Sequence, residues 1–175
     1  ALSMGLVAKV SAGLYKVSSL WTIILFTALY GYFIGTIMPA ESAASSVYAG
    51  DWGPPDRHFF YTPAELYAAI SQWSAEGRAA YIQFRLSLDI VWAVAYSGWL
   101  ATITSVCLRQ AFPPGDRRRL LNVICIVPGL LDLSENFLGF TLVANVEQPI
   151  YFLAWLTAFA TASKWSILVF AHFVM

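Results

Sequence analysis

The chain has 175 residues, of which 59% are apolar and 16% aromatic, and its mean hydropathy is +0.65. Only 11% of the residues are charged, against roughly 25% in a typical soluble domain. This composition excludes an ordinary soluble domain, and a net charge of zero gives no indication of a nucleic-acid partner. The sequence therefore indicates an integral membrane protein, whose first partners are membrane lipids.

Residues 1–18 are expected to form a short interfacial helix. Apolar side chains recur there at roughly helical spacing, while Lys9 and Lys16 lie among Ser and Gly residues. This pattern is typical of an amphipathic helix that lies on the membrane surface.

The first membrane span is expected over residues 20–38. This stretch contains no charged residue and is close to the ~20 residues that a helix needs to cross the hydrocarbon. Pro39 is expected to end it. Gly31 and Gly35 form a G-x-x-x-G pair, which favours close helix packing either within this chain or between two chains.

Residues 39–83 are predicted to be an extramembrane segment, because Ser, Gly, Asp and Pro dominate its first part. Within it, the run Thr62-Pro63-Ala64-Glu65 has the composition of a helix start, with Thr as N-cap and Glu three residues later. Gly77 is a natural C-cap. We therefore expect an amphipathic helix over 62–76, lying on or packed over the bundle.

Three further spans follow, over 84–109, 120–144 and 150–175. The connections 110–119 and 145–149 are short, so these spans are expected to be antiparallel neighbours. The predicted fold is thus all-α and integral to the membrane. It is an antiparallel four-transmembrane-helix bundle, with an extramembrane helix between the first two spans, and residues 1–175 form a single domain.

Glycines and a proline are expected to shape the third span. Gly129 and Gly139 leave room for neighbouring helices, and Pro128 is expected to kink the helix.

The distribution of basic residues predicts an orientation. Lys9, Lys16, Arg109 and the run Arg117–Arg119 fall on one side of the predicted bundle. The positive-inside rule then places both termini and the 110–119 loop on the inner side of the membrane.

Several polar residues lie where a span should be apolar. An ionised carboxylate in hydrocarbon costs several kcal/mol, so such residues face protein or water and often mark a functional site. In the third span, the i, i+3, i+4 spacing puts three of them on one side of a helix. The candidate site consists of Arg85, Asp89, Tyr96, Asp132, Glu135, Asn136 and Lys164.

Two ion pairs are expected among these residues. Arg85 and Asp89 are one turn apart. Asp132 lies 13 residues after Arg119, and Lys164 lies 11 residues before the C-terminus. A helical rise of ~1.5 Å per residue puts these two at similar depth. Glu135 then has no base at its depth, so we expect a protonated carboxyl or one that faces a cavity.

Three interpretations of this cluster stay open: paired charges that only hold the helices in register, a ligand-binding or catalytic pocket, and a proton or ion path. No metal site or cofactor motif is expected, because the two His and two Cys are scattered, without HxxxH or CxxC spacing.

A further pattern is spread over residues 61–166. It consists of Tyr61-Thr62-Pro63-x-Glu65, Glu76-Gly77-Arg78-x-x-Tyr81, Leu88-Asp89, Leu131-Asp132-x-x-Glu135-Asn136 and Lys164. This pattern resembles a family of small, uncharacterised four-span membrane proteins of bacterial type. The resemblance implies the same architecture and the same polar positions, and it brings no activity with it. The layout is also similar, at the level of fold alone, to four-span sterol-binding and sterol-isomerase proteins.

Two functions follow as hypotheses. The first is a non-catalytic subunit or scaffold that packs against other membrane subunits in a respiratory, photosynthetic or transport assembly. The second is a lipid- or sterol-like ligand binder, or an enzyme acting on such a ligand. There Glu135 or Asp89 would be the acid or base, Asn136 an orienting group and Lys164 an electrostatic partner. The expected pocket walls are Trp92, Tyr96, Trp99, Phe137 and Trp165.

Overall fold

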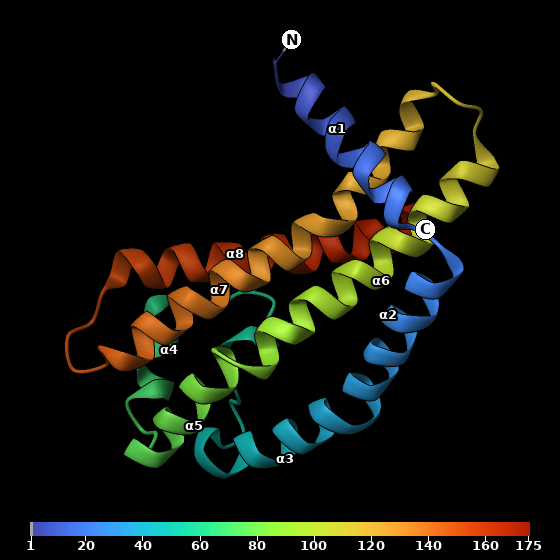
Figure 1. The fold of residues 1–175 in the computed structure, drawn as a ribbon. Coiled ribbons are helices and arrows are strands. Elements are labelled where there is room, and N and C mark those ends of the chain that lie inside the picture. Colours follow the sequence, from blue (N-terminus) through green and yellow to red (C-terminus); the bar gives the residue numbers. More distant parts are fainter. Residues whose placement is uncertain (1) are drawn as a thin grey trace.

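The computed structural model describes residues 2–175, with side chains from residue 5 onward. This part of the chain is all-helical and has no strand. It contains four helical stretches long and apolar enough to cross a membrane, in agreement with the predicted four-span bundle (Figure 1). These stretches are Leu20–Ala49, Ala75–Ala111, Arg117–Ala144 and Tyr151–Val174.

Several of these stretches are built from more than one helical element. The elements in chain order are α1 (Leu2–Val17), α2 (Leu20–Tyr32), the π-helical η1 (Phe33–Ile37), α3 (Met38–Ala49), the 3₁₀ turn η2 (Pro55–Arg57), α4 (Pro63–Ile70), α5 (Ala75–Arg85), α6 (Leu88–Ala111), the 3₁₀ segment η3 (Arg117–Ile126), α7 (Val127–Ala144) and α8 (Tyr151–Val174).

The first span does not end at Pro39, as expected, but continues to Ala49. The wider π-helical turn immediately before the proline explains this difference. There the Met38 N–H donates to the Phe33 carbonyl, five residues back. Pro39 then stands in the first turn of α3, where a missing N–H is tolerated.

The helix predicted over 62–76 begins as expected but ends early, at Ile70. Its start is a capping box: the Thr62 N–H donates to Glu65 Oε2 at 2.7 Å, and the Glu65 N–H donates to Thr62 Oγ1 at 3.3 Å. The Thr62 N–H and the Thr62 hydroxyl both donate to the Glu65 carboxylate, and these two bonds hold the pKa of this exposed carboxyl below its usual value. Leu66 and Ile70 are fully buried, so α4 packs over the end of the bundle instead of lying apart from it.

Gly77 does not cap the first extramembrane helix, because a second helix, α5, has already begun. Ser74 is the N-cap of α5, and its hydroxyl accepts a bond from the Gly77 N–H at 3.0 Å. Gly77 instead allows a close approach: a Cβ added there would lie 2.4 Å from Tyr48 Cβ. Leu86 and Ser87 then separate α5 from α6, so the second span is not one continuous helix.

The third span changes geometry where a kink was expected. The segment η3, Arg117–Ile126, is 3₁₀-helical, and the regular α-helix starts at Val127 with Pro128 in its first turn. The proline is therefore placed where it interrupts no intrahelical hydrogen bond.

Close helix contacts in the core depend on glycines. A Cβ at Gly129 would lie 2.1 Å from Ser97 Oγ, and one at Gly139 would lie 2.6 Å from the Tyr81 hydroxyl oxygen. Both positions therefore pack as the sequence predicts. A further close contact, which the sequence did not reveal, brings the Phe26 ring against Gly98.

The G-x-x-x-G pair on the first span behaves differently. A Cβ added at Gly31 or Gly35 would meet no atom of the described chain within 4 Å. Packing within this chain, one of the two alternatives for this pair, is therefore absent, and no residue of α2 is buried.

The helix α1 is tied to one end of the bundle. The Tyr15 hydroxyl donates to the Arg119 carbonyl at 2.9 Å, and Arg109 Nη2 donates to the Ser18 carbonyl at 3.0 Å. Leu14 of α1 and Ala171 of α8 also belong to one apolar cluster. This end thus holds α1, the basic loop and the C-terminal end of α8, while α4 lies at the other (Figure 1).

Candidate functional site

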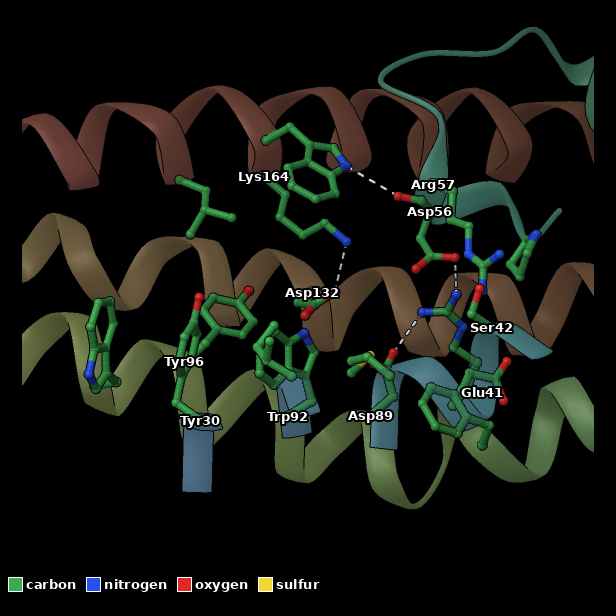
Figure 2. Close-up of a pocket in the computed structure, with 18 of the residues that line it drawn as sticks. Tyr30, Glu41, Ser42, Asp56, Arg57, Asp89, Trp92, Tyr96, Asp132 and Lys164 are labelled. Atoms are coloured by element: carbon green, nitrogen blue, oxygen red, sulfur yellow. Dashed lines mark hydrogen bonds and ion pairs between the residues drawn. The ribbon is translucent and has the colours of Figure 1, made fainter. Parts of the chain in front are cut away.

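A cavity of about 550 Å³ lies inside the bundle. Its walls come from the long first span, from α5 and α6, and from α7, α8 and the loop that contains η2. Figure 2 shows Tyr30 and Tyr96 toward one end, Glu41, Asp56 and Arg57 toward the other, and Asp132 and Lys164 between them. The cavity is therefore divided into an aromatic part and a charged part.

The charged part is organised around Arg85. Its Nη1 donates to Asp89 Oδ2 at 2.6 Å and to Asn136 Oδ1 at 3.3 Å, and its Nη2 pairs with Asp56 Oδ1. The guanidinium also stacks over the Tyr81 ring at 4.9 Å. The predicted Arg85–Asp89 pair is thus present, and Arg85 additionally connects a loop, α6 and α7.

Lys164 forms the second centre. Its Nζ lies 2.8 Å from Asp132 Oδ1 and 2.6 Å from Glu135 Oε2, while Glu135 Oε1 accepts a hydrogen bond from Thr161 Oγ1 at 2.9 Å. The predicted Asp132–Lys164 pair is present. The expectation that Glu135 has no base at its depth is wrong, because the long lysine side chain reaches both carboxyls, which are one turn apart on α7.

Asp56 is the most consequential of the site residues that sequence reasoning missed; Tyr30, Glu41 and Arg57 also line the cavity and were not predicted. The turn composition around it predicted an extramembrane segment, yet η2 brings this carboxyl against the bundle. There the Trp165 Nε1–H also donates to the Asp56 carbonyl at 3.1 Å. Burial by itself would raise the pKa of Asp56, but the nearby Arg85 and Lys164 cations outweigh it and hold the pKa below its ordinary value. No pattern in the sequence distinguishes this aspartate from an ordinary turn residue.

The cluster contains more acids than bases. Arg85 bridges Asp56 and Asp89, and Lys164 bridges Asp132 and Glu135, so four carboxyls share two cations. Glu41 and Arg57 also line the cavity, but they add one charge of each sign and leave the difference unchanged. With all groups ionised, the site therefore has a net charge of two negative units.

Some polar atoms of the site have no hydrogen-bond partner among the described residues. They include the hydroxyl of Tyr96, Nδ2 of Asn136 and Nε of Arg85, all in side chains that are at least 96% shielded from solvent. Tyr96 lines the cavity. Because a buried polar group without a partner costs about 1–3 kcal/mol, a ligand polar atom beside Tyr96 would remove a real penalty.

The aromatic part is a stacked wall. The Tyr30 ring lies 5.4 Å from that of Trp92 and 4.7 Å from that of Trp99, in nearly parallel planes. Trp165 also lines the cavity, as expected. The expectation for Phe137 is wrong: this ring is 65% exposed and contacts Phe140 on the outer surface of α7.

The arrangement separates the two carboxyls that were expected to carry acid–base chemistry. Asp89 lines the cavity, whereas Glu135 lies behind Lys164 and is not among the lining residues. Within residues 5–175, no group of three or more His, Cys, Asp and Glu side chains is arranged to hold a metal ion. His58 is engaged locally, stacking on Trp52 with ring centroids 4.2 Å apart.

Comparison with known proteins gives no relative: no family model matches the sequence, and neither the curated proteins nor the solved structures contain a match. The resemblance over residues 61–166 therefore stays a prediction. The functional argument has to come from the cavity, its charges and its aromatic wall.

Proposed function

We propose that this protein binds an amphipathic, lipid- or sterol-like small molecule inside the membrane. The observation that carries the proposal is the cavity of about 550 Å³ with charged and aromatic parts. Ligand sites in proteins commonly occupy ~300–1,000 Å³, with apolar walls and a few converging polar groups. The apolar body of the ligand would lie along Tyr30, Trp92 and Trp99, and its polar group would lie near Asp89, Asp132 and Lys164.

This proposal accounts for more than a purely structural role of the charges does. Ion pairs that only hold helices in register need no open volume beside them, and an internal cavity lowers stability through lost packing. Here Asp89, Asp132 and Lys164 all face a cavity, and Tyr96 presents a hydroxyl without a partner. A bound ligand would fill the volume and satisfy that hydroxyl.

Isolation of the protein in a mild detergent, followed by native mass spectrometry and mass analysis of the organic extract, tests the proposal. We expect an amphiphile to co-purify in a near-stoichiometric amount. Leu168 lines the cavity, so Leu168→Trp should fill it and abolish retention. Val169, next to it, is 55% exposed on the outer face of α8, and Val169→Trp is the matched control. Equal retention in wild type and both variants, or none in wild type, would overturn the proposal.

The orientation in the membrane is part of the same proposal. The end of the bundle with α1 and the basic loop carries Lys9, Lys16 and Arg117–Arg119, and the positive-inside rule places this end on the inner side. The charged part of the cavity, which lies toward the η2 loop, would then open nearer the outer side.

An accessory-subunit role is the second candidate. The observation that favours it is the outer face of the first span, where α2 has no buried residue and nothing in the described chain contacts the Gly31 and Gly35 positions. Small residues of this kind permit close approach of a partner helix. Affinity purification in mild detergent decides it: a monodisperse 19.3 kDa species without companions would contradict this role.

A further inference from the structure

The charge of the site indicates what kind of ligand it takes. Four carboxyls share the cations of Arg85 and Lys164, so two negative charges have no counterpart in the chain if all groups ionise. Charges in a low-dielectric interior are retained when an opposite charge lies close by. A surplus of two carboxyls beside an open cavity is therefore matched by protons, by a cation, or by both.

The directions of the existing contacts favour a cation over an anion. Both Nη atoms of Arg85 are already engaged by carboxylate oxygens, and Nζ of Lys164 lies between two of them. An anionic group would have to compete for these donors. By contrast, Asp89 and Asp132 each give one oxygen to an ion pair, and both carboxyls line the cavity. The carboxylates of the cavity wall can therefore take a further cation, whereas the Nη atoms of Arg85 and Nζ of Lys164 are already paired.

Aromatic rings stand beside these carboxyls. Trp92 and Tyr96 line the cavity next to Asp89 and Asp132 in Figure 2, and their ring centroids lie 5.2 Å apart. The face of a Trp or Tyr ring attracts an ammonium group within about 6 Å. Carboxylates and aromatic faces together form a typical environment for an organic cation.

Resting on the proposed function, we infer that the ligand is a cationic amphiphile: a protonated amine or quaternary ammonium group lies among Asp56, Asp89 and Asp132, with its apolar body along the aromatic wall. The positive charge of the ligand offsets one of the two negative charges that Arg85 and Lys164 leave unbalanced. With a neutral amphiphile, the two unbalanced negative charges could be removed only by protonation of carboxyls. An anionic amphiphile would add to the negative charge.

Three probes with the same chain and different headgroups test this inference: tetradecyltrimethylammonium, tetradecanol and tetradecanoate. Their affinities for the purified protein are measured in one detergent by the change in tryptophan fluorescence, since Trp92, Trp99 and Trp165 line the cavity. We expect the ammonium probe to bind at least tenfold more tightly than the other two. Leu168→Trp should abolish binding of all three, which locates them in the cavity.

Two carboxyl variants and one control complete the test. Asp89→Asn and Asp132→Asn should each lower the affinity for the ammonium probe at least tenfold and leave the affinity for tetradecanol unchanged. Glu147 is exposed in the loop before α8, so Glu147→Gln removes a carboxylate far from the cavity and should change nothing. If one site variant melts far below wild type, the other one decides the test.

The outcomes separate the two proposals. If the three probes bind equally, or tetradecanoate binds best, and Leu168→Trp blocks them, the cavity binds amphiphiles but the inference of a cation is wrong. If no probe responds to Leu168→Trp, binding in the cavity itself is refuted. Preference for the ammonium probe that persists in both carboxyl variants also overturns the inference, because the selectivity would then come from elsewhere.

Discussion

Asp56 and Arg85 form an ion pair that joins the loop between the first two spans to the interior of the bundle. Arg85 sits at the end of α5 with 3% of its surface exposed, and it also pairs with Asp89. The loop is therefore held by the same side chain that organises the charged part of the cavity. Release of Asp56 from Arg85 should therefore open the cavity at the end of the bundle that contains the η2 loop.

Replacement of Asp56 should loosen the loop without unfolding the bundle. In Asp56→Asn, Arg85 keeps Asp89 as a partner, so we expect a loss of roughly 1.5–3 kcal/mol, typical of a hydrogen bond to a charged group. The measurements are thermal melting in detergent and the rate of proteolysis within 51–62. Asp51→Asn changes an exposed aspartate of the same loop and serves as the control. Equal rates of proteolysis in wild type and both variants would show that the Asp56–Arg85 pair does not hold the loop.

Asp132 and Glu135 share Lys164, so replacing both should destabilise the protein much more than replacing either one. Either Asp132→Asn or Glu135→Gln leaves the Lys164 ammonium group with one carboxylate partner, so each variant should lose only a little stability. The double variant leaves a buried lysine unpaired, which costs about 3–5 kcal/mol in comparable cases, so the effects should be far from additive. Addition of Lys164→Met to the double variant should restore much of the melting temperature. Strict additivity would show that Lys164 is not shared.

Acidification should release the loop through Asp56. The pKa of this carboxyl is held below its ordinary value of 3.8 in the folded protein, because the Arg85 and Lys164 cations outweigh the effect of burial. The stabilisation is therefore fully present above about pH 4, and it is lost as the pH falls through the lowered pKa. Pepsin cleavage near Phe59 and Phe60 should therefore rise as the pH falls below about 4.

Asp56→Asn separates this effect from the titration of the other acids and of pepsin itself. The variant should be cleaved readily both above and below about pH 4, without this rise. If the variant shows the same pH profile as wild type, another group controls the loop.

Gly31 and Gly129, both in apolar spans, should respond differently to substitution by alanine. Gly129→Ala places a methyl group against Ser97 and the Ala93 carbonyl, and overpacking of this kind costs roughly 1–3 kcal/mol. Gly31→Ala meets nothing within the chain, so the isolated protein should melt at or slightly above the wild-type temperature. Loss of stability in Gly31→Ala would indicate a packed partner helix and would favour the subunit role.

Labelling of single cysteines tests the orientation. In a background with Cys107→Ala, we place cysteines at Ser3, Asp51 and Pro114, and treat sealed cells with an impermeant maleimide. Cys125 is fully buried and should stay unlabelled. Asp51→Cys should label from outside, whereas Ser3→Cys and Pro114→Cys should label only after permeabilisation. Labelling of Asp51→Cys and Pro114→Cys from the same side would contradict the four-span topology.

The sequence alone was sufficient for the class of fold, the number of spans and most of the polar site. Hydropathy over ~20 residues is a local property, and the membrane imposes it on every spanning helix. The Asp132–Lys164 pair followed from depth alone, because helical rise converts position in the sequence into height in the bilayer. Arg85 and Asp89 followed from the spacing of one helical turn.

Only the tertiary structure showed how helices rotate about their axes and where a loop folds back. Gly31 and Gly129 are both small residues in apolar spans, yet one faces outward and the other contacts α6. Glu135 shares a lysine 29 residues away, since a long side chain can span one helical turn on a neighbouring helix. Asp56 enters the site from a segment whose composition indicates only a turn. The cavity is a property of the space between these helices, and spacing along one helix does not determine the volume enclosed by four.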